Sequence, residues 1–80
     1  MKVDVKLYAT LKSYAPVNLE IGESFSIELE AGSVEEVLTK LEIPAEKAKI
    51  IMVNGIRVND TSHVMKDGDL LVIFPPIGGG

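Results

Sequence analysis

The chain has 80 residues, 46% of them hydrophobic, which suits one domain with a single compact core. It contains no cysteine, which excludes a disulfide framework, a thiolate metal site and a cysteine nucleophile. Twelve acidic and eight basic residues give a net charge of −4. We therefore expect no nucleic-acid partner, because phosphate binding requires a basic surface.

The sequence shows neither a targeting signal nor a membrane span. Met1 leads directly into a strand pattern instead of a charged and then apolar leader. No apolar run approaches the roughly 20 residues that cross a bilayer. We expect a cytoplasmic protein that does not contact a membrane.

Two strands are predicted in the first thirty residues, because apolar and polar residues alternate there with a period of two. Residues 10–15 begin a helical turn that Pro16 ends or redirects. Gly22 lies in the connection, so the two strands should pair as a loose hairpin. The apolar positions are Val3, Val5 and Leu7 in the first strand, and Phe25, Ile27 and Leu29 in the second.

A helix is predicted to begin after Ser33. Ser33 and Glu36 have the spacing of a capping box, in which each side chain satisfies one free amide of the first turn. Pro44 closes the helix, and residues 45–49 form a short turn or a one-turn helix. The spacing of one buried helical face is carried by Val34, Val37, Leu38 and Leu41.

Three more strands are predicted after the helix. Residues 50–53 and 56–58 flank Asn54-Gly55, a strong hairpin signal because both positions tolerate positive φ. The turn Asp67-Gly68-Asp69 leads into residues 70–74, whose unbroken apolar run is typical of a central strand.

The predicted order is β-β-α-β-β-β, and the apolar helix face can be buried only against one face of the sheet. This indicates a two-layer α+β domain with the β-grasp, or ubiquitin-like, fold. We expect a mixed sheet of four to five strands with one main helix on one face and the last strand parallel to the first. Residues 1–74 form the domain, and residues 75–80 form a flexible tail.

The other face of this sheet has no helix to cover it. If Leu71 and Ile73 face the helix, the alternate residues of the last strand point the other way. An exposed patch that contains Phe, Tyr and Arg is typical of a docking surface, whereas the opposite register would bury Phe74 in the core. The expected partner-binding residues are Leu70, Val72, Phe74, Tyr8 and Arg57, with Lys2, Asp4 and Lys6 at the rim.

The chain ends Phe74-Pro75-Pro76-Ile77-Gly78-Gly79-Gly80. The two prolines stiffen the segment, and the glycines carry no side chain. Six residues reach at most ~20 Å, enough to run from a docking surface into a buried pocket. This pattern predicts a terminus that enters the active site of another protein; the alternative is a frayed end without function.

The domain itself shows no convincing active site. His63 is the only histidine, and neighbouring Ser62 has no third partner nearby in the sequence, so a turn position is the favoured role. Glu36 is explained by helix capping, and Asp67 and Asp69 by turn chemistry. There is no EF-hand spacing, phosphate-binding glycine loop or zinc ligand set, so we expect no metal and no cofactor on the chain itself.

Together these residues resemble the MoaD/ThiS family of small ubiquitin-like sulfur carriers. The likeness covers the opening strand at 3–9, Val53-Asn54-Gly55, residues 66–69 and the closing glycines. Phe74-Pro75-Pro76 is similar to the ending of the small subunit of molybdopterin synthase. The third glycine departs from that subunit and occurs in some thiamin-pathway carriers, which leaves the pathway open.

The resemblance implies a carrier that is not an enzyme. An E1-like adenylating enzyme of the MoeB/ThiF type would use ATP to adenylate the carboxylate of Gly80, and a sulfur donor would convert it to a thiocarboxylate. The acceptor would be the large subunit of molybdopterin synthase. Gly78 and Gly79 would pass a narrow channel that excludes a Cβ, while Pro75 and Pro76 would limit the freedom lost on binding.

Three alternatives use the same chain differently. The thiocarboxylate could serve thiamin thiazole synthesis or tRNA thiolation. The chain could also be a protein modifier that forms isopeptide bonds through Gly80, because an amine can attack an acyl-adenylate. Finally, it could be a plain interaction module with an inert tail.

Overall fold

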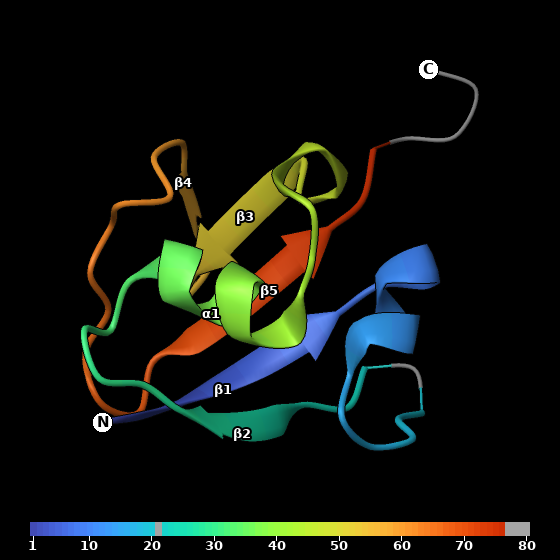
Figure 1. Ribbon diagram of the computed structural model, residues 1–80, viewed down its shortest axis with the longest axis horizontal. Helices are drawn as coiled ribbons and strands as arrows, with labels where there is room; N and C mark the ends of the chain where they lie inside the picture. The colour runs from blue at the N-terminus through green and yellow to red at the C-terminus, as the bar shows by residue number, and fades with distance from the viewer. Residues whose placement is uncertain (21, 77–80) are drawn as a thin grey trace.

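The computed structural model describes residues 1–20 and 22–76 of the chain. Five strands form one mixed sheet in the order β2-β1-β5-β3-β4, and α1 crosses one of its faces (Figure 1). This confirms the predicted α+β, β-grasp architecture. The elements are β1 (Lys2–Leu7), the 3-10 helix η1 (Ala9–Tyr14), β2 (Phe25–Glu28), α1 (Val34–Leu41), the 3-10 helix η2 (Ala45–Lys47), β3 (Ile50–Val53), β4 (Ile56–Val58) and β5 (Leu70–Phe74).

The first and last strands lie side by side at the centre of the sheet. β1 and β5 run parallel, with Val5 opposite Leu71 and Leu7 opposite Ile73. β3 pairs with the other edge of β5 in the antiparallel direction, so β5 has a neighbour on each side. This central position accounts for the unbroken apolar run of β5 that the sequence predicted.

The core lies between the sheet and α1. The apolar face of α1 packs as predicted, with Val34, Val37 and Leu38 buried and Leu41 half-buried. The η1 helix and two loops add core residues that no periodic pattern marked in the sequence: Leu11, Ile43 and Met65.

The start of α1 follows only half of the predicted capping box. Ser33 Oγ accepts a hydrogen bond from the Glu36 amide at 3.1 Å, as predicted. In the described part of the chain, however, the Glu36 carboxylate does not accept from the Ser33 amide. It accepts from the amides of Glu30, Ala31 and Gly32 at 2.8–2.9 Å. The reason is that the chain turns at Gly32, with φ of +83°, and brings these three amides together.

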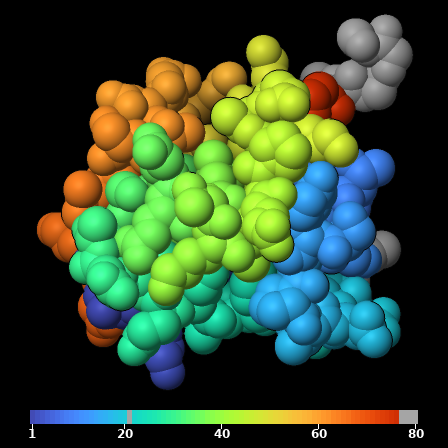
Figure 2. Space-filling model, in the orientation of Figure 1, coloured from blue at the N-terminus to red at the C-terminus, as the bar shows by residue number. Residues whose placement is uncertain are grey.

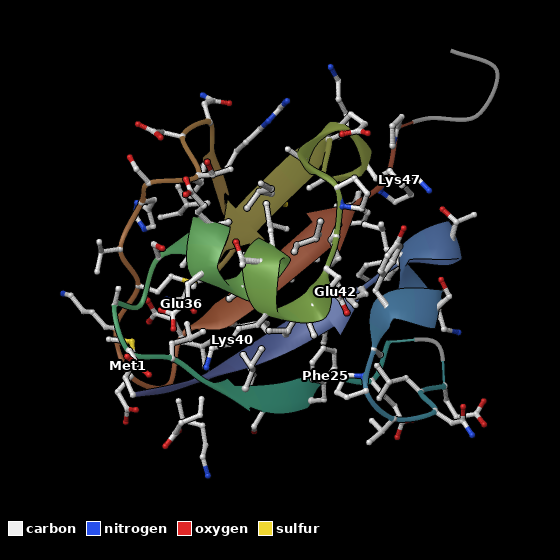
Figure 3. All side chains as sticks on the ribbon, viewed as in Figure 1. Met1, Phe25, Glu36, Lys40, Glu42 and Lys47 are labelled. Carbon is white, nitrogen blue, oxygen red and sulfur yellow. The ribbon has the colours of Figure 1, made fainter. Side chains whose placement is uncertain are left out.

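Glu36 and Lys40 also protect the edge of the sheet (Figure 3). Lys40 Nζ lies 3.9 Å from the Glu36 carboxylate and donates to the Glu28 carbonyl at 2.9 Å. Since β2 is an edge strand, these contacts occupy backbone groups on β2 and just beyond it that could otherwise pair with another chain.

The end of α1 is set by backbone geometry. Glu42 adopts a left-handed conformation with φ of 58°, and the Ile43 amide donates to the Leu38 carbonyl at 2.9 Å. Pro44 follows and cannot extend the helix. Within residues 1–20 and 22–76, no helix is long and apolar enough to cross a bilayer.

We predict that Glu36→Gln makes stability less sensitive to acid. Hydrogen bonds from the Glu30 amide and its neighbours hold the pKa of Glu36 below its ordinary 4.5. The ionised carboxylate therefore stabilises the fold above pH 4.5, and this contribution is lost as the pH falls through the lower folded value. The variant should be less stable than the parent at pH 7 and should lose less stability on acidification, measured by urea unfolding at several pH values.

Glu35→Gln is the matched control, because the Glu35 side chain makes no hydrogen bond within the described residues. Its acid sensitivity should equal that of the parent. Equal acid sensitivity of Glu36→Gln and the parent would contradict the role assigned to Glu36.

Candidate functional site

The candidate site begins on the face of the sheet opposite α1, which we call the open face. Leu71 and Ile73 of β5 are 0% exposed on the helix side. Leu70, Val72 and Phe74 alternate with them and are half-buried on the other side. The predicted orientation of β5 is therefore confirmed, and the register that would bury Phe74 in the core is excluded.

An aromatic pair lies where the sheet ends. The rings of Tyr8 and Phe74 stack with centroids 4.7 Å apart and an interplanar angle of 14°. The Tyr8 amide donates to the Ile73 carbonyl at 3.2 Å, which extends the contact between β1 and β5 by one residue. The sequence placed these two side chains together, and they are in contact.

Arg57 lies on the open face at the edge of the sheet. The register pairs Arg57 with Met52, Met52 with Val72, and Val72 with Lys6. With neighbouring strands ~4.8 Å apart, Arg57 lies about 10 Å from β5. These four side chains form a row across the sheet that is apolar at its centre, with a cationic side chain at each end.

Two further residues of this face, Ile50 and Met52, were not predicted from the sequence. They lie opposite Phe74 and Val72 and are half-buried, while Ile51 and Val53 enter the core. All four residues of β3 are apolar, so its alternation cannot be read from composition. The Asn54-Gly55 turn was the available signal, because a two-residue hairpin fixes which residues pair.

The apolar centre of the open face comes from three segments of the chain. It consists of Tyr8, Ile50, Met52, Leu70, Val72 and Phe74. At the predicted polar rim, Asp4 accepts a hydrogen bond from Ser26 Oγ at 2.9 Å.

The turn before β5 has a structural role, as the sequence indicated. The Asp69 carboxylate accepts from the Lys66 amide at 2.8 Å and from Asn54 Nδ2 at 2.9 Å. These hydrogen bonds lower the pKa of Asp69, and the one from the Lys66 amide contributes most. Asn54 Oδ1 in turn accepts from the Leu70 amide at 2.9 Å, so the β3–β4 hairpin is joined to the start of β5.

His63 contributes backbone groups to the fold. Its amide donates to the Asp60 carbonyl at 3.0 Å, and its carbonyl accepts from the Val34 amide at 3.0 Å. No group of three His, Cys, Asp or Glu side chains among the described residues is arranged to hold a metal ion.

The chain leaves the sheet after Phe74. The Phe74 carbonyl accepts from the Lys49 amide at 3.0 Å, and Pro75, which has no amide hydrogen, follows directly. Pro75 is half-buried and Pro76 is exposed. Gly78, Gly79 and Gly80 lie outside the described residues, so the division into a 1–74 domain and a 75–80 tail stays a prediction.

The fold and the order of these elements agree with a known family. The ThiS family model matches residues 5–80. The chain therefore belongs to the ThiS family of small ubiquitin-like sulfur carriers and modifiers. A search of curated proteins gave no significant match.

Three solved structures illustrate the likeness. One chain of the protein-protein complex of subunits 1 and 2 of molybdopterin-converting factor from Helicobacter pylori 26695 is 24% identical to this chain. The TM-score is 0.63, and 100% of both chains is covered. A Pyrococcus furiosus protein provisionally described as molybdopterin converting factor, subunit 1, is 27% identical, with a TM-score of 0.68 and coverage of 95% and 98%. Small archaeal modifier protein 1 from Methanosarcina acetivorans is 25% identical, with a TM-score of 0.65 and coverage of 99% and 96%.

We predict that Phe74→Ala destabilises the domain much less than Ile73→Ala. Ile73 is fully buried, and truncating such a side chain costs about 2–5 kcal/mol. Phe74 is half-buried, so the variant should lose its stacking with Tyr8 and part of its burial, about 1–2 kcal/mol. Urea unfolding of both variants measures the difference. Equal losses would show that Phe74 belongs to the core.

Proposed function

We propose that this chain is a sulfur carrier for molybdopterin, the organic part of the molybdenum or tungsten cofactor. Its reactive group is the main-chain carboxylate of Gly80. The observation that carries the proposal is the continuity between the open face and the tail. The apolar face ends at Phe74, and Pro75-Pro76 leads from it into the glycine segment.

The proposed reaction takes place on partner proteins. An E1-like adenylating enzyme of the MoeB/ThiF type joins the Gly80 carboxylate to AMP and releases pyrophosphate from ATP. A persulfide of the sulfur donor displaces AMP to give an acyl disulfide. A thiol then cleaves the S–S bond, which leaves the thiocarboxylate on Gly80 and a disulfide on the donor system.

The chain positions the Gly80 carboxylate and supplies no side chain that reacts. It has no cysteine, so the sulfur is carried on the main chain. Gly78 and Gly79 present no Cβ to a narrow channel, and Pro75 and Pro76 reduce the entropy lost on insertion. The chain is thus a cytoplasmic co-substrate, or the non-catalytic small subunit of a synthase, and ATP is bound by its partner.

Two features favour the molybdopterin pathway. The ending Phe74-Pro75-Pro76 is similar to that of the small subunit of molybdopterin synthase. The Helicobacter pylori structure is a complex of subunits 1 and 2 of molybdopterin-converting factor. It supports the large subunit as the acceptor for this chain. We place Tyr8, Val72 and Phe74 at the centre of that contact because they lie on the open face, close to where the chain leaves the sheet.

A second candidate function is protein modification. The likeness to small archaeal modifier protein 1 favours it, since an acyl-adenylate at Gly80 can also react with a lysine amine. Thiamin thiazole synthesis and tRNA thiolation differ from the main proposal only in the acceptor. Digests that contain lysines bearing a glycine remnant would support the modifier, and the acceptor that co-purifies would identify the pathway.

We predict that incubation with a cognate adenylating enzyme, ATP and a sulfur source makes the intact chain heavier by the difference between sulfur and oxygen. Intact-protein mass spectrometry measures this change. A chain that ends at Ile77 is the control, and its mass should not change, because it lacks the whole glycine segment that would enter the adenylating enzyme. An unchanged mass of the full chain would contradict the proposal.

We also predict that Val72→Asp lowers the rate of sulfur loading by about tenfold or more at limiting carrier concentration. A carboxylate at the centre of the open face would lose its hydration in the complex, a cost that Lys6, opposite it in the register, offsets only in part. Val17→Asp is the matched control, because Val17 is exposed in a loop outside the sheet. Its loading rate should equal that of the parent. If Val72→Asp is also loaded at the parental rate, the open face is not the docking surface.

A further inference from the structure

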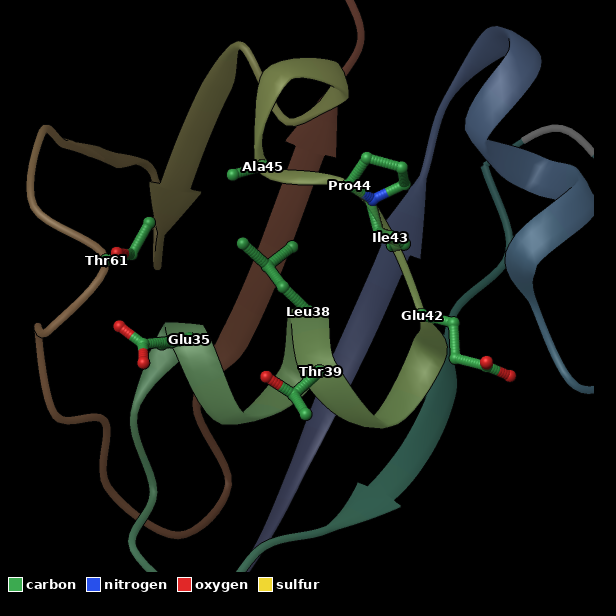
Figure 4. A pocket seen from close by; sticks show the side chains of 8 residues that line it. All are labelled: Glu35, Leu38, Thr39, Glu42, Ile43, Pro44, Ala45 and Thr61. Carbon is green, nitrogen blue, oxygen red and sulfur yellow. The ribbon is translucent and has the colours of Figure 1, made fainter.

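A groove lies on the helix side of the domain, opposite the open face. Figure 2 shows this side, with α1 and the residues that follow it at the front. The groove has a volume of about 390 Å³ and runs between α1 and the segment leading to η2 (Figure 4). We call it the helix-side groove; its lining residues are Glu35, Leu38, Thr39, Glu42, Ile43, Pro44, Ala45 and Thr61.

The walls of this groove are fixed by the fold. Leu38 and Ile43 are only 6% and 5% exposed and form an apolar floor. The Ile43 amide donates to the Leu38 carbonyl at 2.9 Å, and the Glu35 amide donates to the Thr61 carbonyl at 2.9 Å. Because backbone hydrogen bonds join both walls, a ligand would meet a preformed surface.

The charged residues that line the groove are both acidic. Glu35 and Glu42 lie at its two ends (Figure 4). Glu35 lies in the first turn of α1, whereas Glu42 follows the last residue of α1 in a left-handed conformation, and their side chains point away from each other (Figure 4). Within the described residues, neither carboxylate accepts a hydrogen bond or pairs with a cation.

The lysines of the neighbouring elements do not neutralise these carboxylates. Lys40 of α1 donates to the Glu28 carbonyl at 2.9 Å on the β2 side. Lys47 of η2 contacts Tyr14 Oη at 3.4 Å on the η1 side. The groove thus combines an apolar floor with two carboxylates that lack cationic partners.

We propose that the helix-side groove binds an extended segment of a partner protein that carries two basic side chains with an aliphatic side chain between them. The basic side chains would pair with Glu35 and Glu42, and the aliphatic one would cover Leu38. Charge complementarity over a preformed apolar floor favours this occupant.

This binding mode goes beyond the proposed function. The groove and the open face lie on opposite sides of the sheet, so one partner could hold the helix side while another contacts Phe74. A protein that binds the groove could therefore retain the carrier while its tail is in use.

The test is selection of peptides from a random twelve-residue display library on the full chain. We expect enriched peptides with Lys or Arg on both sides of an aliphatic residue. A synthetic copy of the strongest peptide should shift the amide resonances of Leu38, Thr39 and Ala45 in the ¹⁵N-labelled parent chain. Its affinity should fall about tenfold in the Glu35→Gln/Glu42→Gln double variant, as expected for the loss of two ion pairs.

Glu20→Gln/Glu30→Gln is the matched control, because it removes the same charge from exposed residues outside the groove. It should leave the affinity unchanged. Selection of neutral or acidic peptides, or resonance shifts confined to the open face, would overturn the proposal. The resonance shifts are measured on the parent chain, so this test does not depend on whether a variant folds. Shifts of groove resonances that grow with protein concentration alone would assign the groove to a second copy of this chain and would equally overturn it.

Discussion

The parallel pairing of β1 with β5 is the constraint on which the rest of the structure depends. It places the last strand between β1 and β3, so that every second residue of β5 must enter the core. The remaining residues are directed to the open face, together with those of β3 that lie opposite them. The same pairing brings Tyr8 against Phe74 at the point where the chain leaves the sheet. The pairing of β1 with β5 thus determines which residues of β5 lie on the open face and places them next to Pro75, where the chain leaves the sheet.

Most of the fold could be predicted from the sequence because its signals are local. The period of two in β1, the spacing of Val34, Val37 and Leu38, and the Asn54-Gly55 turn each specify one element without reference to the others. Two features could not be predicted in this way. The contribution of Ile50 and Met52 to the open face depends on register between strands, and the contacts of Glu36 depend on how the chain folds over Gly32.

The two sides of the domain differ in charge as well as in shape. The open face has an apolar centre with Lys6 and Arg57 at the ends of one row, whereas the helix-side groove has Glu35 and Glu42 at its ends. Lys40 and Lys47 are engaged in contacts away from the groove. A chain with net charge −4 therefore presents opposite charges to partners that approach from opposite sides. This arrangement suits a protein that is passed between several others.

The central claim is that the open face is the surface by which partners receive the tail. Cross-saturation NMR in a complex with a cognate adenylating enzyme tests it most directly, because it reports which methyl groups lie at the interface. The account predicts intensity loss at the methyl groups of Ile50, Leu70 and Val72, with those of Val34 and Val37 unaffected. Loss confined to the methyl groups of Leu38 and Ala45 on the helix side would contradict it.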